Sequence, residues 1–363
     1  MVACGGKQQA SAPVVAPWGE MGDSVDFDDD FDLGEIQQSG EMILLTLTGP
    51  EYYYDYRGRQ LGTQYLLAAK FAATLGVRLR VEVCRDSADM VKRLHDGDGD
   101  IMSTTTVGRL EASPSKEDLA QELAAWYKPE ILEEVRRQEA YLMSSRSVKR
   151  RIFSPMLDRK GGIISHYDAY FQQYSRTIRW DWRLMAAQCY QESTFDPRAT
   201  SWAGAKGLMQ IMPSTADHLG LPRDKMYDPE QNIAAAARYL GELEHSFSDI
   251  QDRRERTNFV LAAYNGGAHH IRDAMALCQR DGRNAHQWRH VSEYVLKLAQ
   301  PIYYNDPVVV YGYMRGAETA DYVQKIQQRW DSYRGVKTPR QGFTQEPRKA
   351  HRERRKYDIN LGS

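Results

Sequence analysis

The hydrophobic pattern of the chain changes near residue 150, and this change constrains the fold more than any other feature. Before that point, apolar segments of strand length alternate with amphipathic segments of helix length, whereas residues 163–333 show helical patterns only. The length of 363 residues also exceeds what a single core usually supports. The sequence therefore predicts two packed domains, an α/β part followed by an all-α part.

The first part carries the pattern of a parallel α/β unit. Residues 41–49 predict a buried strand, residues 61–76 an amphipathic helix that ends at a glycine, and residues 77–83 a second strand. Strand, helix and strand in this order form a parallel unit. Residues 113–142 then predict two closing helices.

The second part predicts a succession of helices. Asp228 stands before a proline and has Gln231 three residues after it, which is a strong helix start, and the run NGG at 265–267 is a typical helix stop. The expected helices span residues 166–178, 181–192, 214–219, 229–245, 255–264, 267–280, 290–300 and 317–332.

Composition and charge narrow the classes of function. The chain is 42% hydrophobic and 27% charged, as soluble globular proteins are, and it has no run of about eighteen apolar residues that could cross a bilayer. Its net charge is −1, but residues 20–35 form an acidic stretch and residues 337–356 form a basic one. We interpret the basic stretch as a solvated end, with no nucleic-acid partner.

The cysteines and histidines predict neither a metal site nor a cofactor. No histidine pairs with an acid at metal-ligand spacing, and no CxxC motif is present. The four cysteines are far apart: Cys4, Cys84, Cys189 and Cys278.

The first of these cysteines has a special context. Cys4 lies in the opening segment MVACGGKQQASAPVVAP, after two small apolar residues and before a linker rich in Gly, Ser, Ala and Pro. The end of a bacterial lipoprotein signal looks like this, although the positive and hydrophobic parts of such a signal are absent. Cys4 is therefore a candidate lipid-attachment residue, and an ordinary cytosolic N-terminus is the alternative.

A single acid lies at the end of an apolar helical segment. Trp182, Met185 and Cys189 recur at helical spacing and face a core, and Glu192 follows almost one turn later. Apolar surroundings and the negative end of the helix dipole both disfavour a charged carboxylate, so we expect the acid form to persist near neutral pH. A general acid that protonates a glycosidic oxygen needs this property. Taken alone, a glutamate near a helix end is more often a surface residue than a catalytic one.

Four motifs around this acid occur in a fixed order. They are QES (191–193), GAKGLMQIMPSTA (204–216), AAYNGG (262–267) and ETADYV (318–323). In this order they resemble the motifs of the lysozyme-like lytic transglycosylases, and their spacing is most similar to the F-type membrane-bound murein enzymes. The order of elements in residues 41–103 resembles a periplasmic solute-binding lobe whose second lobe is missing.

The resemblance implies roles for nine residues. Glu192 would be the catalytic acid and base, Tyr322 would hold it through a hydroxyl, and Asn265 would hydrogen-bond an N-acetyl group. The other implied substrate-binding residues are Ser193, Gly207, Leu208, Met209, Gln210 and Tyr264. Some have structural alternatives: core positions for Leu208 and Met209, a packing aromatic for Tyr264 and a helix C-cap for Asn265.

The resemblance also implies the reaction. Peptidoglycan strands would be cleaved at the β-1,4 bond between N-acetylmuramic acid and N-acetylglucosamine, with a 1,6-anhydro product. Since the resemblance assigns the acid and base role to Glu192 alone, the substrate N-acetyl group would take the place of a second carboxylate. A goose-type lysozyme-like hydrolase and a non-catalytic wall-binding protein are the alternatives.

The sequence thus predicts an α+β multidomain chain at the cell envelope. A peptidoglycan substrate implies the periplasmic face of the outer membrane, with a lipid anchor at Cys4. No protein partner is predicted. The expected divisions are a flexible lipoprotein-type tether (1–40), an incomplete α/β solute-binding-like lobe with closing helices (41–150), an all-α lysozyme-like transglycosylase domain (151–333) and a basic disordered tail (334–363).

Overall fold

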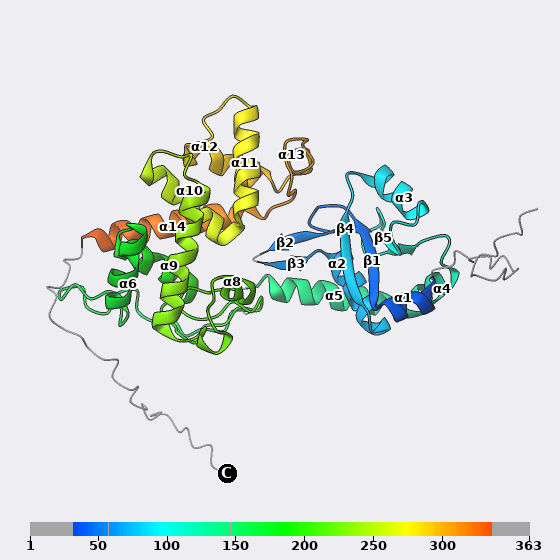
Figure 1. The fold of residues 1–363 in the computed structure, drawn as a ribbon, viewed down its shortest axis with the longest axis horizontal. Coiled ribbons are helices and arrows are strands. Elements are labelled where there is room, and N and C mark those ends of the chain that lie inside the picture. Colours follow the sequence, from blue (N-terminus) through cyan, green and yellow to red (C-terminus); the bar gives the residue numbers. More distant parts are fainter. Residues whose placement is uncertain (1–31, 57, 145–146, 336–363) are drawn as a thin grey trace, which may run out of the picture.

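The structure, a computed structural model, describes residues 32–56, 58–144 and 147–335. A part that contains a β-sheet and a mostly helical part lie side by side (Figure 1). Cys4 and the basic stretch at 337–356 lie outside the described residues.

A four-stranded mixed sheet forms the centre of the first part. Its strand order is β4–β1–β5–β6, with β1 parallel to both of its neighbours and β6 antiparallel to β5. The parallel pairing of β1 with β4 confirms the predicted strand–helix–strand unit, in which α2 is the helix. The elements are β1 (Glu41–Thr46), α2 (Thr63–Leu75), β4 (Arg78–Val83), α3 (Ser87–His95), β5 (Ile101–Ser103), β6 (Leu110–Ala112), α4 (Glu117–Trp126) and α5 (Pro129–Leu142).

A helix stands where the sequence predicts the end of a flexible tether. In α1 (Leu33–Ser39), the Asp32 carboxylate accepts the Leu33 N–H at 2.7 Å, and the Glu35 carboxylate accepts the Asp32 N–H at 3.0 Å. The second bond belongs to a capping box between Asp32 and Glu35, which satisfies N–H groups that a helix start otherwise leaves unpaired. Ile36 is fully buried in the core of the sheet-containing part. The packed structure therefore begins before residue 41.

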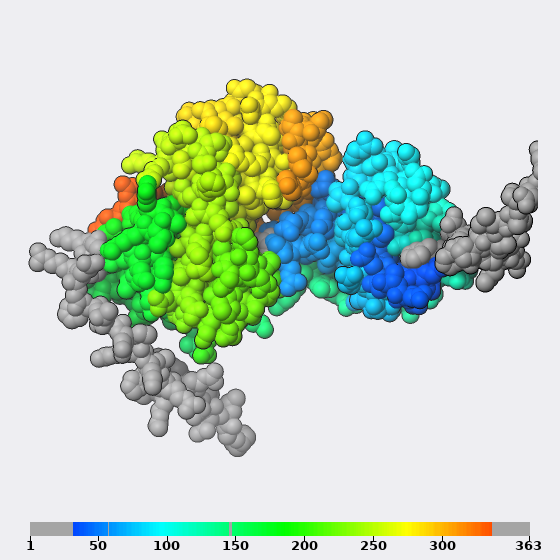
Figure 2. Space-filling view, in the orientation of Figure 1, coloured from blue at the N-terminus to red at the C-terminus, as the bar shows by residue number. Residues whose placement is uncertain are grey.

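A short β-hairpin that the sequence analysis does not predict joins the two parts. Its strands, β2 (Tyr54–Tyr56) and β3 (Arg59–Leu61), pair antiparallel. Tyr54 and Leu61 are buried in the same hydrophobic cluster as the helices of the second part. In Figure 2 this blue segment fills the space between the green helical surface and the sheet-containing part. The core of the helical part thus includes residues from the N-terminal half of the chain.

The helices of the second part match the predicted ones to within a few residues. The Asp228 carboxylate accepts the Gln231 N–H and begins α9, as predicted. The four-residue α13 and the short 3-10 helix η3 are additional. The elements are α6 (Asp168–Ser175), η2 (Arg176–Ile178), α7 (Trp182–Ser193), α8 (Pro213–His218), η3 (Arg223–Lys225), α9 (Pro229–Ser246), α10 (Arg253–Gly266), α11 (Ala268–Arg280), α12 (Trp288–Lys297), α13 (Pro301–Tyr304) and α14 (Gly316–Arg334).

Two of these helices, α7 and α14, pack antiparallel and position the predicted acid. The Trp330 indole N–H donates to the Asp181 carboxylate at 3.0 Å, just before α7 begins. At the other end of α7, Glu192 meets Tyr322 in the second turn of α14. The packing of α7 on α14 therefore decides where the carboxylate points.

Candidate active site

Glu192 lies in the last turn of α7, where the chain turns sharply away. The helix ends because Thr194 and Phe195 adopt positive φ angles of 54° and 63°. Such angles are strained for residues other than glycine, so surrounding contacts must hold them. The Thr194 hydroxyl donates to the Arg151 carbonyl at 2.6 Å and supplies one such contact. Glu192 itself remains partly exposed, as a group that exchanges protons with a ligand must be.

Tyr322 holds the Glu192 carboxylate where the sequence analysis expects it. The Tyr322 hydroxyl donates to Glu192 Oε1 at 2.5 Å and accepts from Gln188 Nε2 at 3.3 Å. Burial raises the pKa of Tyr322 well above 10, and the negative charge of Glu192 raises it further. The phenol therefore stays a hydrogen-bond donor throughout the neutral range.

The backbone next to the acid is also fixed. Arg150 Nη1 donates to the Glu192 carbonyl at 2.9 Å, which brings a cation to the negative end of the helix dipole. Ser193 is fully buried and its hydroxyl donates to the Cys189 carbonyl at 3.2 Å. The Ser193 side chain therefore faces the core, and its position shapes the backbone beside Glu192.

Asn232, which the sequence analysis does not single out, organises the loop of the second motif. Its amide Nδ2 donates to the carbonyls of Lys206 (3.0 Å) and Met226 (2.8 Å), and its Oδ1 accepts the Met209 N–H at 2.8 Å. Gly207 has a φ of 81°, and a Cβ there would lie 2.5 Å from Asn232 Nδ2. Asn232 and the Met226 carbonyl thus explain why a glycine stands here, at a position for which the resemblance implies substrate binding.

The side chains of the same motif divide between the core and the loop. Leu208 and Met209 are fully buried, which fits the alternative of core residues. Gln210 uses its Nε2 within the loop, donating to the carbonyls of Ala199 at 3.1 Å and Gly207 at 2.9 Å. The Gln210 Oε1 has no hydrogen-bond partner among the described residues, so this oxygen is the atom that can meet a ligand.

The Tyr264 hydroxyl is engaged within the protein. It donates to the Met209 carbonyl at 2.8 Å, and its ring centroid lies 5.3 Å from that of Tyr239. Burial raises the pKa of Tyr264 well above 10, and the charge of nearby Glu192 adds to the effect. Tyr264 therefore ties the loop of the second motif to α10, as a packing aromatic with a satisfied hydroxyl does.

Asn265 retains a donor that faces no protein partner in the described part of the chain. It lies inside α10, whose C-cap is Gly267 with a φ of 87°. The alternative that Asn265 is the helix C-cap is therefore wrong. The Asn265 Oδ1 accepts from the Thr319 hydroxyl at 2.8 Å, which fixes the amide plane. Its Nδ2 has no partner among the described residues and can donate to a ligand.

The polar residues that sequence reasoning missed share one signal. Gln188 and Asn232 are fully buried, and Thr319 is 2% exposed, yet each holds a predicted site residue. Buried polar groups need hydrogen-bond partners, and such networks occur where a geometry must be unique. A polar residue at a position where the helical spacing predicts an apolar one could have indicated these residues.

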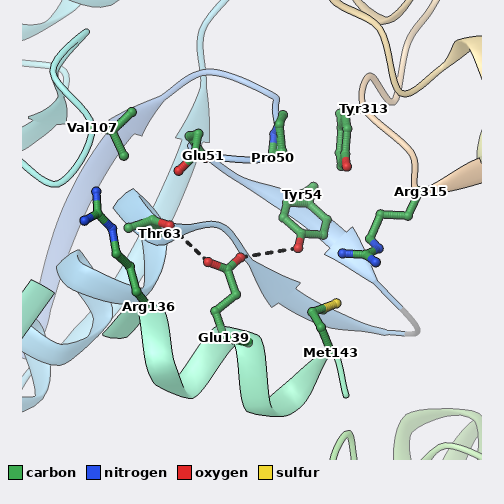
Figure 3. A pocket seen from close by; sticks show the side chains of 11 residues that line it. Pro50, Glu51, Tyr54, Thr63, Val107, Arg136, Glu139, Met143, Tyr313 and Arg315 are labelled. Carbon is green, nitrogen blue, oxygen red and sulfur yellow. Dashed lines mark hydrogen bonds between the residues drawn. The ribbon is translucent and has the colours of Figure 1, made fainter. Parts of the chain in front are cut away.

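A separate cavity of about 520 Å³ lies where the two parts meet (Figure 3). The Glu139 carboxylate in α5 accepts from the hydroxyls of Tyr54 (3.3 Å) and Thr63 (3.0 Å), and burial raises the pKa of Glu139. Tyr313 and Arg315, which precede α14, line the cavity from the helical part. Glu192 does not line this cavity, so it is distinct from the candidate active site.

Two further findings concern metals and membranes. Within residues 32–56, 58–144 and 147–335, no group of three or more His, Cys, Asp or Glu is placed to hold a metal ion. No helix in that same part of the chain combines the length and apolar character that a membrane span requires.

Comparison with known families gives one match, which lies within the helical part. Residues 169–287 match the family model described as the transglycosylase SLT domain, a region that includes Glu192, Asn232 and Asn265. This match agrees with the resemblance that the order of the four motifs shows. Tyr322 and α14 follow the matched region.

Similar proteins carry names that agree with this class. The membrane-bound lytic murein transglycosylase F of Desulfosudis oleivorans is 43% identical over 146 residues, which are 40% of this chain and 31% of that protein. The protein of the same name from Pseudomonas putida is 36% identical over 173 residues, 48% of this chain and 35% of that one. The match thus spans about a third of the length of these relatives.

Among solved structures, the 70 kDa soluble lytic transglycosylase of Escherichia coli is similar over 47% of this chain and 24% of that one. The two are 25% identical, and the TM-score is 0.35.

Proposed function

We propose that the chain is a lytic murein transglycosylase that uses Glu192 as its single acid and base. The observation that carries this proposal is the Glu192 carboxylate, partly exposed at the end of a buried helix and bonded to Tyr322 beside an SLT domain match. The substrate is the peptidoglycan strand, at the β-1,4 bond between N-acetylmuramic acid and N-acetylglucosamine. The names of the relatives support this substrate.

In the proposed reaction, Glu192 first donates one proton and then takes one back. Glu192 donates its proton to the glycosidic oxygen as the bond from that oxygen to the muramic C1 breaks. The muramic C6 hydroxyl then attacks C1, and Glu192 takes the hydroxyl proton, which closes the 1,6-anhydro ring and restores the acid. Asn265 Nδ2 is the donor that can hold the substrate N-acetyl group during this sequence.

Two acids in or beside the motifs, Asp196 and Glu318, are engaged within the protein, which supports assistance by the substrate. Asp196 accepts from the backbone N–H groups of Arg151 (2.6 Å) and Arg198 (3.0 Å). Glu318 accepts from the Tyr56 hydroxyl and from Arg315. Both carboxylates hold the protein together, so the N-acetyl oxygen is left to stabilise the charge that develops at C1.

Product analysis tests the reaction directly. Purified sacculi are digested and the soluble fragments are weighed by mass spectrometry. We expect anhydro-muropeptides, which are about 18 Da lighter than hydrolysis products because no water is added. Products that carry the added water would show a goose-type muramidase reaction in which water attacks.

Zymography separates an enzyme from a non-catalytic wall-binding protein. Glu192→Gln keeps the size of the side chain but removes its acid, so we expect clearing of peptidoglycan to fall about a thousandfold or more. Glu242→Gln, which changes a glutamate on α9 outside the four motifs, is the matched control and should clear like the wild type. Equal clearing by Glu192→Gln and the wild type would end the assignment.

We also propose that the sheet-containing part is an incomplete solute-binding-like lobe, with the division from the transglycosylase part at about residue 150. The parallel β4–β1–β5 core supports the lobe.

We propose in addition that the chain works on the periplasmic face of the outer membrane through a lipid on Cys4. Metabolic labelling with a radioactive fatty acid tests the anchor: label on the wild type and none on Cys4→Ser is the expected result.

A further inference from the structure

A second groove of about 520 Å³ runs beside the candidate active site, between the end of α7 and the outer side of α14. Gln191, the residue before Glu192, lines it, and so does Arg150, whose guanidinium donates to the Glu192 carbonyl at 2.9 Å. Along α14 the groove extends from Lys325 to Ser332, which are seven residues or roughly 10 Å apart. It therefore begins next to the catalytic residue and leads away from it.

The groove is lined by basic residues and by no acidic residue among those described. Arg150, Lys325 and Arg329 contribute positive charge, and none of the described residues that line the groove is acidic. Lys325 pairs at 2.6 Å with Asp321 one turn earlier, where both side chains are half exposed. Such an exposed pair is weak and leaves the ammonium available to a ligand.

Arg329 is the most constrained of the three cations. Its guanidinium lies 3.9 Å from the centroid of the Tyr190 ring, and its Nε is buried without a hydrogen-bond partner among the described residues. Stacking on an aromatic ring fixes the plane of a guanidinium and so prepares it for a planar anion. A carboxylate is the planar anion that matches this arrangement best.

We propose that this groove binds the carboxylates of the peptide that is attached to N-acetylmuramic acid, so that the enzyme favours peptide-bearing strands over stripped ones. The proposal rests on the function proposed above. The sugar rings of a glycan strand are neutral, and a stripped strand keeps one carboxylate on each lactyl group. A peptide carries carboxylates that lie at a distance from the sugar. The groove likewise leads away from Glu192.

The ratio of kcat/KM on peptide-bearing strands to kcat/KM on amidase-stripped strands tests the preference. The variant is Arg150→Gln/Lys325→Gln, which leaves Arg329 on its ring. We expect the ratio to fall about fivefold, and the wild-type ratio to fall similarly as salt is raised to about 0.5 M. The matched control is Arg334→Gln, which removes one charge from the same helix outside the groove and should keep the wild-type ratio.

Two outcomes would overturn the proposal: an unchanged ratio in the double variant, or an equal fall in Arg334→Gln. A binding assay separates this failure from failure of the proposed function. In the Glu192→Gln background, peptide-bearing strands should bind about fivefold more tightly than stripped strands, and the two groove substitutions should abolish the difference. A wild type that cleaves neither strand would refute the proposed function, while equal binding of both strands by Glu192→Gln would refute the groove.

Discussion

The two parts of the molecule approach the candidate active site in different ways. Within the helical part, buried side chains position the site: Tyr322 bonds Glu192, Asn232 bonds the loop of the second motif and Thr319 bonds Asn265. The sheet-containing part reaches the margin of the site through its hairpin, at partly exposed contacts. The candidate active site is thus positioned by side chains of one part, and the other part contacts its margin.

The hairpin contacts two regions that are far apart in the sequence. The Arg59 Nε donates to the Ala203 carbonyl at 2.9 Å, and the Tyr56 ring stacks on Trp202 with centroids 6.3 Å apart. The Tyr56 hydroxyl also donates to Glu318, next to the threonine that fixes Asn265. If the comparison holds, changes in the buried network should cost much more than changes in the hairpin.

The largest effect is expected for Asn232→Ala. This change leaves the Met226 carbonyl and the Met209 N–H without partners, removes one of the two donors to the Lys206 carbonyl and opens space under the loop. It should therefore lower the free energy of unfolding by about 3 kcal/mol. Chemical denaturation measures it. Gln231→Ala, at the neighbouring exposed position, is the control and should change stability by less than about 0.5 kcal/mol. Equal losses in both variants would remove Asn232 from the network.

The second-largest effect should be a pH-dependent loss of stability that comes from the helical part. Burial lowers the pKa of His270 in α11 to about 4, below the ordinary 6.5. Between these values the unfolded chain binds the proton and the folded one does not, so stability falls as the pH drops through this window. From about pH 7.5 to about pH 5 the loss should be about 2 kcal/mol.

The difference between the wild type and His270→Gln isolates this effect, because the carboxylates titrate in both proteins. Denaturation at several pH values should give a smaller acid loss in the variant, by about 2 kcal/mol at about pH 5. Parallel stability curves for the two proteins would contradict a neutral, buried His270.

Tyr322→Phe should have a smaller effect that appears in activity. It removes a hydrogen bond to a carboxylate, which is worth about 1.5 kcal/mol or more, so kcat should fall about tenfold. Turnover of sacculi measures it. Tyr333→Phe, on the same helix, removes a hydroxyl that bonds the Pro155 carbonyl and should leave kcat near the wild-type value. A fall of similar size in both would mean that packing of α14 is what matters.

Local patterns in the sequence were sufficient to predict the helices of the helical part. Asp228 with Gln231 marked the start of α9, and the four motifs placed Glu192 and Tyr322 on elements that pack together. These features depend on residues within a few positions of one another, or on a family resemblance. They did not reveal that Leu208 and Met209 are fully buried, because apolar residues beside a cleft and in a core look alike.

Long-range contacts explain what the sequence did not reveal. The hairpin strands have three residues each, and Tyr54 and Leu61 are buried by helices much later in the chain. The Asp32 cap was hidden in an acidic stretch whose composition resembles a linker. Asn232 acts on backbone groups up to 26 residues away, which no local pattern can show.

The smallest effect is expected for the hairpin, and it is the result that could break the comparison. Tyr56→Phe/Arg59→Ala removes the hydrogen bonds to Glu318 and Ala203, which are partly exposed, so the free energy of unfolding should fall by less than about 1 kcal/mol and kcat by less than about threefold. Arg85→Ala, just before α3 in the sheet-containing part and paired with Asp89, is the control for losing one exposed arginine. If kcat instead falls about tenfold or more while the helical part stays folded, the hairpin is part of the active site, because its contacts with Glu318 and Ala203 then position the residues beside them.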